Sequence, residues 1–320
     1  MADYTMRGVF DLIKRSGSEF SDNDSLRLAA ALAFNAIFSI PPLLIIIIRA
    51  AGFFFGEEAV SGKLANEIST AVGPEAAEEV QKIVENAQIN ASGIHLWIGI
   101  GTLLFASTTF FATLQQSLNS IWNLKVKPTN GILRMAKERV FSFGIILSIA
   151  FLMLMSFVIS AVISILSDFI SRLLPADIWY WAIKLVDFVV SVGLITFLFA
   201  LIYKYLPDAY IRWRDTLIGA LVTAVLFTIG KLLISWYLST SDPGSAYGAA
   251  GSVILILVWI YYSSLIIFFG AEFTQQYAEE YGQRVRPKPH AVFVEQREVV
   301  NDPQDANSGR PRPQGRFEPK

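Results

Sequence analysis

The sequence predicts an all-α, polytopic membrane protein with six transmembrane helices, and three observations lead to this fold class. The chain has 320 residues, of which 53% are apolar and only 17% are charged, whereas soluble domains carry about 25% charged residues. It contains six apolar runs long enough for a spanning helix, which needs roughly 20 residues. These runs do not alternate polar with apolar residues as barrel strands do. Helices are then the structure that satisfies a backbone in lipid.

The predicted transmembrane domain, residues 28–273, contains all six spans. They cover residues 28–55, 94–117, 140–166, 179–206, 215–238 and 251–273.

The distribution of Lys and Arg predicts how these spans are oriented. Nineteen of the 26 cations lie in segments 1–27, 123–139, 207–214 and after residue 273. The alternate connections, 56–92, 167–178 and 239–250, hold only three. Because cytoplasmic loops carry the excess of Lys and Arg, we expect a multi-pass protein of the bacterial cytoplasmic (inner) membrane with both termini in the cytoplasm.

Segments outside the spans have their own patterns. Residues 1–27 form a predicted cytoplasmic arm, the N-terminal arm, in which Met6, Val9, Phe10 and Ile13 share one face of a short interfacial helix. Its alternative is a simple capped leader.

The outer loop, residues 56–92, predicts two amphipathic helices whose apolar faces need cover from the bundle, from a second copy or from a partner. The C-terminal tail, residues 274–320, is rich in proline and charge and is predicted to be a largely disordered cytoplasmic segment.

Charged residues within the predicted spans form the first candidate site. Arg49, Lys184 and Lys231 fall in the outer half of their spans, and Asp187 lies one turn from Lys184. Together they could bind an anionic group such as a lipid phosphate. Alternatively, Arg49 and Lys184 extend to the headgroups while Lys231 pairs with Asp187.

A second set of residues suggests gating or hinge positions. Pro41 and Pro42 follow Ser39 in the middle of the first span, where they should kink or break the helix. Gly248 and Gly251 open the last span with small residues that permit close backbone approach. Fixed kinks that serve packing are the alternative.

A third set predicts a polar cavity at the inner side. Gln115, Gln116 and Asn119 end the second span, and Glu272 ends the sixth. Contacts between helices would need the same residues. For Glu272, the structural interpretation is a cap or a pair with an arginine, and the functional one is a proton relay.

The sequence argues against most enzymatic chemistry. It has no cysteine and only two histidines, His95 and His290, which lie far apart in the sequence. Thiolate metal sites and a cysteine nucleophile are therefore excluded, and no metal, cofactor or catalytic residue is predicted.

Several motifs resemble those of the YihY/BrkB family of bacterial inner-membrane proteins, over about residues 8–280. The motifs are AAALAF at 29–34, FSIPPL at 38–43, LQQSLNSIW at 114–122, YKYLP at 203–207, GA at 219–220, YGAAGS at 247–252, WIYYSS at 259–264 and GAE at 270–272.

This resemblance implies a six-helix protein of the cytoplasmic membrane. Members of the family have carried a ribonuclease BN label, a virulence role, or a suggested role in envelope lipid or lipopolysaccharide export. The ribonuclease label does not suit this sequence, because no inner segment gathers the carboxylates or histidines of a metal nuclease and no aromatic, basic groove for nucleic acid is present.

Two functional hypotheses follow. The first is a transporter or flippase for an anionic envelope lipid or lipopolysaccharide-like component, and the alternative is a non-transporting scaffold for cell-envelope machinery. Expected partners are membrane lipids, with a homodimer and an envelope-machinery protein as further candidates, and no nucleic acid.

Overall fold

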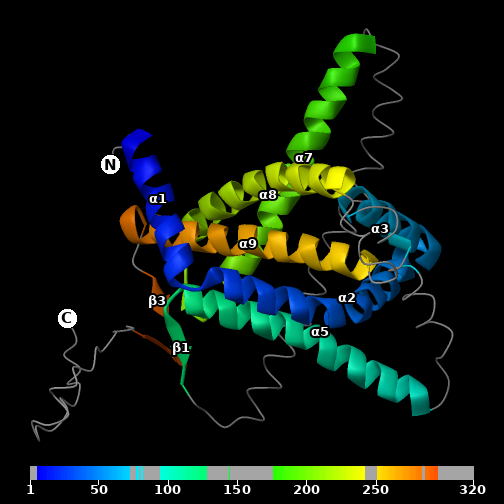
Figure 1. The fold of residues 1–320 in the computed structure, drawn as a ribbon, viewed down its shortest axis with the longest axis horizontal. Helices are drawn as coiled ribbons and strands as arrows, with labels where there is room; N and C mark the ends of the chain where they lie inside the picture. The colour runs from blue at the N-terminus through cyan, green and yellow to red at the C-terminus, as the bar shows by residue number, and fades with distance from the viewer. Residues whose placement is uncertain are drawn as a thin grey trace, which may run out of the picture.

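The computed structural model describes residues 6–72, 77, 78, 81, 94–127, 144, 176–241, 251–282 and 285–294, and these residues are mostly helical (Figure 1). The helices are α1 (Met6–Asp22), α2 (Ser25–Phe55), α3 (Glu57–Val72), α5 (Ile94–Ile121), α7 (Ala176–Tyr205), α8 (Trp213–Ser241) and α9 (Gly251–Glu280). The strands are β1 (Leu124–Val126), β2 (Ala209–Tyr210), β3 (Arg286–Pro287) and β4 (Ala291–Phe293). They form two antiparallel pairs, β1 with β4 and β2 with β3.

Five of the six predicted spans coincide with helices, namely α2, α5, α7, α8 and α9. In the described residues, three helical stretches are long and apolar enough to cross a membrane: Ile183–Tyr205, Trp213–Ile234 and Val253–Glu280. The predicted span 140–166 lies outside the described residues except for Gly144. The helical class is confirmed, while the count of six spans and the orientation of the termini stay predictions.

Helix α9 lies in the middle of the bundle, between α8 and α2 (Figure 1), and α1, α2, α5 and α8 all pack against it. The largest buried side chains include Leu32, Leu118, Tyr203 and Phe268. Burying each apolar side chain contributes about 2 kcal/mol relative to its exposure in water. At one end of the bundle, which we call the hub end, α2 and α8 begin while α5, α7 and α9 finish.

Small residues bring α8 and α9 close together. Each helix carries a glycine four residues before a threonine, and because the helices are antiparallel, the glycine of each faces the threonine of the other. A methyl group added to Gly219 would collide with Thr274, and one added to Gly270 would collide with Thr223. This contact is the close approach that small residues permit between membrane helices.

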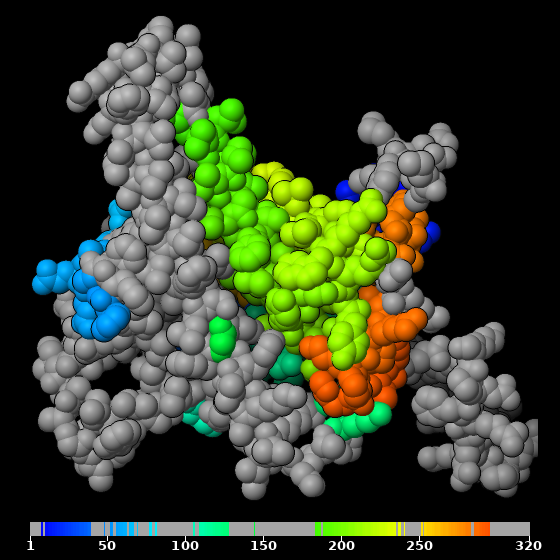
Figure 2. Space-filling model, turned by 180° about the vertical axis from the view of Figure 1, so that it is seen from behind, coloured from blue at the N-terminus to red at the C-terminus, as the bar shows by residue number. Residues whose placement is uncertain are grey.

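Helix α8 is exposed on one side of the molecule (Figure 2), and its exposed residues include large apolar ones. Leu217, Leu221, Val225 and Ile229 recur every four residues along it, and each is between 43% and 50% exposed. A continuous apolar ridge of this size is unusual on a soluble protein. It suits a helix whose outer surface contacts lipid.

Pro41 and Pro42 were expected to kink or break the first span; the break is wrong, because α2 remains helical from Ser25 to Phe55, and the kink stays a prediction. Spanning helices can contain proline because neighbouring helices help to satisfy the backbone groups that proline leaves unpaired. Helix α2 packs against both α5 and α9.

The part of the apolar face of α3 that the structure describes is covered by the protein itself. Val60 and Leu64 are buried, and α3 packs against α2, α8 and α9. Nearly all of the second predicted outer helix lies outside the described residues.

Helix α1 is longer than predicted and turns a different face to the bundle. Leu12 is buried against Phe273 and Tyr277 of α9, whereas Phe10 and Ile13, from the predicted apolar face, are 68% and 47% exposed. The helix is amphipathic as expected, but its buried side packs on protein.

The prediction of a tail that is largely disordered from residue 274 is wrong for residues 274–282 and 285–294. Helix α9 continues to Glu280, and the chain then forms β3 and β4. Two or three residues of strand carry too little periodicity to be recognised from sequence. The rest of the predicted tail, from residue 295, lies outside the described residues.

Candidate functional site

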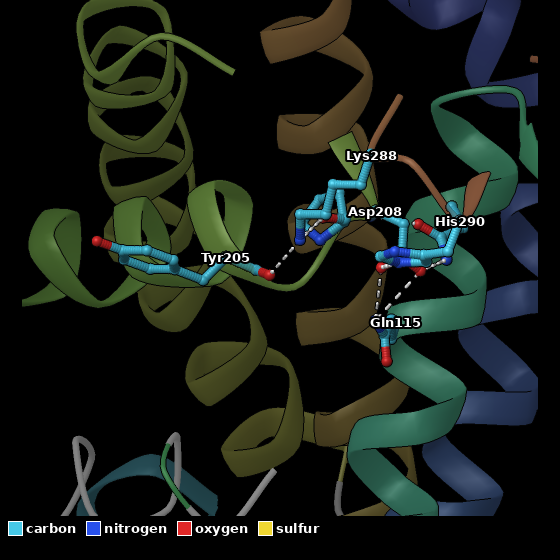
Figure 3. A network of polar contacts seen from close by, with 7 residues as sticks. Gln115, Tyr205, Asp208, Lys288 and His290 are labelled. Carbon is cyan, nitrogen blue, oxygen red and sulfur yellow. Dashed lines mark hydrogen bonds and ion pairs between the residues drawn. The ribbon is translucent and has the colours of Figure 1, made fainter. Parts of the chain in front are cut away.

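The candidate site lies at the hub end, where α5 finishes, α7 turns into α8, and the C-terminal strands return to the bundle (Figure 3). Local sequence sets these ends. Helix α7 stops at Tyr205, two residues before Pro207, because proline disfavours helical geometry in the residue preceding it. Past the end of α5, Asn123 adopts a left-handed conformation with φ 52°, which asparagine tolerates better than most residues.

Asp208 is the centre of this site, and only 5% of the residue is exposed. Asn119 Nδ2 donates to its Oδ2 at 2.8 Å, and Asp208 N donates back to Asn119 Oδ1 at 2.8 Å. Gln115 Nε2 reaches both carboxylate oxygens, at 3.3 and 3.4 Å. Two side chains of α5 therefore hold the turn between α7 and α8.

The C-terminal segment completes the arrangement. His290 Nε2 and Asp208 Oδ1 form a hydrogen bond of 2.9 Å. Lys288 N donates to Asp208 O at 2.9 Å, and Lys288 Nζ donates to Pro207 O at 2.8 Å and to Tyr205 O at 3.4 Å. A cation at these carbonyls also suits the negative end of the α7 dipole. We call Gln115, Asn119, Asp208, Lys288 and His290 the Asp208 hub.

The strands extend the hub through the backbone. Leu124 of β1 lies opposite Phe293 of β4, and Ala209 of β2 lies opposite Pro287 of β3. Lys127 N also donates to His290 O at 2.9 Å. The two strand pairs thus fix segments more than 70 positions apart in the chain to one another, and polar side chains of the hub hydrogen-bond to each other.

The hub is not a metal centre on its geometry. In the part of the chain that the structure describes, no group of three or more His, Cys, Asp or Glu could hold a metal ion. The hub contains one acid, one histidine, one lysine and two amides, and this composition suits a structural contact.

A separate set of polar side chains lies along α2 and α5, and one hydrogen bond in it joins the two helices. Asn35 Nδ2 donates to Thr113 Oγ1 at 2.9 Å, and Thr113 Oγ1 donates to Thr109 O at 3.0 Å. Ser39 Oγ donates to Asn35 O at 2.9 Å. We call Asn35, Ser39, Thr109 and Thr113 the α2–α5 seam. It lies on the part of α5 that leads to Gln115 and the hub.

The predicted inner polar set is divided by the structure. Gln115 and Asn119 meet at Asp208, whereas Gln116 is exposed, because the next residue on a helix points about 100° away. Glu272 does not join the hub. It is fully buried on α9, where its Oε1 accepts a hydrogen bond of 2.8 Å from Asn23 Nδ2.

The described side chains do not test the predicted anionic pocket. Lys184 is exposed and Lys231 is half-buried. The side chains of Arg49 and Asp187 lie outside the described residues. The pocket therefore stays a prediction.

Among the suggested hinge residues, Ser39 is buried in the α2–α5 seam and Gly251 is buried where α9 begins. Gly248 lies outside the described residues, as do the side chains of Pro41 and Pro42.

Sequence reasoning missed Asp208, Lys288 and His290 as parts of one site. An acid directly after the YKYLP motif was the available signal for Asp208. Nothing comparable pointed to Lys288 and His290, which were assigned to a disordered tail.

Comparison with known proteins finds a family model and relatives that match this sequence. The family model described as "Virulence factor BrkB" matches residues 16–294. A UPF0761 membrane protein of Mannheimia succiniciproducens is 28% identical over 264 residues, which make up 80% of this chain and 85% of the relative.

Two further relatives carry the same UPF0761 description. The protein from Haemophilus influenzae is 26% identical over 268 residues, which cover 83% of this chain and 94% of the relative. The protein from Psychromonas ingrahamii is 29% identical over 258 residues, which cover 79% and 83% respectively. No solved structure matches the chain.

Proposed function

This chain belongs to the BrkB family of membrane proteins, and on that premise we propose that it moves an anionic envelope lipid, of the phospholipid or lipopolysaccharide class, across the cytoplasmic membrane. The observation that carries the proposal is the α2–α5 seam. It consists of polar side chains along two predicted spans, where polar residues are costly and commonly mark a path for substrate.

The surroundings of the seam suit an amphiphile. Phe34 and Phe38 neighbour the seam residues of α2, and Phe105 lies one turn from Thr109 on α5. These three rings are each about 60% exposed, with values of 60%, 61% and 61%. A polar headgroup could follow the seam while its acyl chains stay in lipid beside the rings.

The cations of the predicted pocket would supply the preference for an anion. Arg49 follows Ser39 by ten residues in the uninterrupted helix α2, which is about 15 Å along the axis. In this proposal, Arg49 attracts the headgroup at one end of the seam, and the Asp208 hub stabilises the bundle at the other end.

The experiment is lipid movement in liposomes that contain the purified protein and a phospholipid with a fluorescent headgroup. A quencher added outside measures the fraction of lipid that changes leaflet. We expect the double variant Asn35→Leu with Thr113→Val to slow the movement at least ~10-fold, a change of about 1.4 kcal/mol in the barrier. Removing both hydrogen-bonding partners leaves no orphaned polar group, so stability should change little.

Thr240→Val is the matched control, because Thr240 is exposed on α8 and bonds back to Trp236 O of its own helix. It should move lipid as the parent does. The proposal is contradicted if folded parent protein moves no more lipid than empty liposomes. Under the scaffold alternative, deletion of residues 62–90 would abolish cellular function while the seam variant would retain it.

A further inference from the structure

A buried acid outside the hub and the seam joins the N-terminal arm to the centre of the bundle. Glu272 of α9 is 0% exposed. Its Oε1 accepts the hydrogen bond from Asn23, which lies in the turn between α1 and α2. Its Oε2 is buried and has no hydrogen-bond partner among the described residues. A carboxylate in such a place is costly unless a cation or a proton neutralises it.

Charged groups around Glu272 do not provide a neutralising cation. On α1, Glu19 acts on it as a second negative charge, and Arg15 pairs with Glu280 at 3.4 Å. At the start of α2, Arg27 pairs with Asp24 at 3.1 Å.

Helix α8 contributes another acid at this end of the bundle, the buried Asp215. Among the described residues, the arginines near Glu272 thus pair with other acids. The hydrogen-bond partner of Glu272 is the neutral amide of Asn23.

The N-terminal arm lies antiparallel along α9, so the Asn23 contact is one of several that dock it. Leu12 packs on Phe273 and Tyr277, and the rings of Phe20 and Phe269 meet edge to face at 6.0 Å. The apolar contacts do not depend on charge. The contact between the α1–α2 turn and Glu272 does depend on charge, because it buries the carboxyl group.

We propose that Glu272 is a proton-binding site whose occupancy controls the docking of the N-terminal arm on α9. With a proton taken from water at the hub end, the carboxyl group is neutral, and Asn23 Nδ2 donates to Oε1 in the docked arm. Release of that proton to water leaves a buried negative charge beside Glu19. The turn between α1 and α2 then separates from α9 so that water reaches the carboxylate.

This site can be tested without any transport assay, so its failure is distinct from a failure of the proposed function. The chain has no cysteine, and Ser18→Cys on α1 with Lys125→Cys on β1 places two unique spin labels on exposed positions. Pulsed electron spin resonance on the purified full-length protein then measures the distance between them from about pH 5 to about pH 9, a range in which buried carboxyls titrate.

We expect one docked distance at low pH and an undocked fraction that grows at least ~10-fold towards high pH, as expected for a site that binds one proton. Glu272→Gln keeps the shape and removes the charge, so it should stay docked throughout. Asp22→Asn, an exposed acid of the same arm, is the matched control and should behave as the parent does. Glu19→Gln should decrease the undocked fraction at high pH.

Two results would overturn the assignment. One is a distance distribution in the parent that does not change with pH. The other is a Glu272→Gln protein that undocks with the same pH dependence as the parent, which would assign the titration to other groups. Should Glu272→Gln fail to fold, Asn23→Ala serves instead, since it keeps the carboxyl group and should raise the undocked fraction already at low pH. An Asn23→Ala arm that stays fully docked at low pH would also contradict the proposal.

Discussion

Asp208 shows how much a single side chain contributes at the hub end. Its carboxylate accepts hydrogen bonds from two amides of α5 and contacts the imidazole of His290, while its backbone N–H and C=O bond to Asn119 and Lys288. Hydrogen bonds to a charged group contribute about 1.5–3 kcal/mol each when buried. This residue therefore ties three separate parts of the chain together.

Asp208→Asn should lower the free energy of unfolding by about 2 kcal/mol, because the new amide replaces a charged acceptor and sets one NH2 group against the donors of Gln115 and Asn119. Denaturant titration in detergent micelles measures the change. Asp22→Asn, which replaces an exposed acid, should stay within about 0.5 kcal/mol of the parent. Equal effects of the two substitutions would show that the hub contributes little.

The residues of the hub were only partly predictable. The polarity of Gln115 and Asn119 at the end of an apolar span indicated a polar site, and both donate hydrogen bonds to Asp208; the inner cavity itself stays a prediction. Their partner was not predictable, because Asp208 lies 93 and 89 residues away and no local pattern encodes such contacts. The face of the helix also decides which polar residues join the hub, since Gln116 is exposed on another face of α5.

At the scale of elements, the packing of α8 against α9 depends on two glycines without side chains. Gly270 faces Thr223 and the hydroxyl of Tyr203, and that hydroxyl bonds to Thr223 Oγ1 at 3.1 Å and to Ile267 O at 2.7 Å. The close approach therefore supports a buried hydrogen-bond network shared by α7, α8 and α9.

Gly270→Ala should destabilise the bundle by about 1–3 kcal/mol, the usual cost of adding a methylene group to a packed core. Gly193→Ala is the control on α7, where an added methyl group meets no atom within 4 Å. Because alanine favours helices over glycine, Gly193→Ala should be neutral or stabilising. Thermal unfolding of both variants in the same detergent compares them, and a Gly270→Ala protein as stable as Gly193→Ala would refute the packing argument.

Long elements were predictable and short ones were not. Apolar runs located α2, α5, α7, α8 and α9 to within a few residues at most ends, although α9 continues seven residues past the predicted end at Phe273. The strands were not predicted, because they form by pairing with distant segments and the local sequence carries no strand pattern. Pro41 and Pro42 do not end α2, because neighbouring helices can compensate for proline in a spanning helix.

At the scale of the whole molecule, the long helices and the hub predict which end of the bundle faces which side of the membrane. Helix α8 has 29 residues and α9 has 30, which correspond to about 44 and 45 Å, longer than the hydrocarbon core of about 30 Å. Both ends of each helix can therefore reach the headgroup regions. The hub end, with β1 to β4, would then lie on one side of the membrane, and the excess of Lys and Arg predicts the cytoplasm.

The most direct test of this account is the labelling of single cysteines by a membrane-impermeant maleimide in the naturally cysteine-free chain. Lys125→Cys, Tyr210→Cys and Val292→Cys place exposed thiols on β1, β2 and β4, and Thr240→Cys places one near the opposite end of α8. We expect the three hub cysteines to react in inverted membrane vesicles and not in intact spheroplasts, and Thr240→Cys to show the reverse. Hub cysteines that react from outside the cell, or a Thr240→Cys that shares their side, would contradict the account.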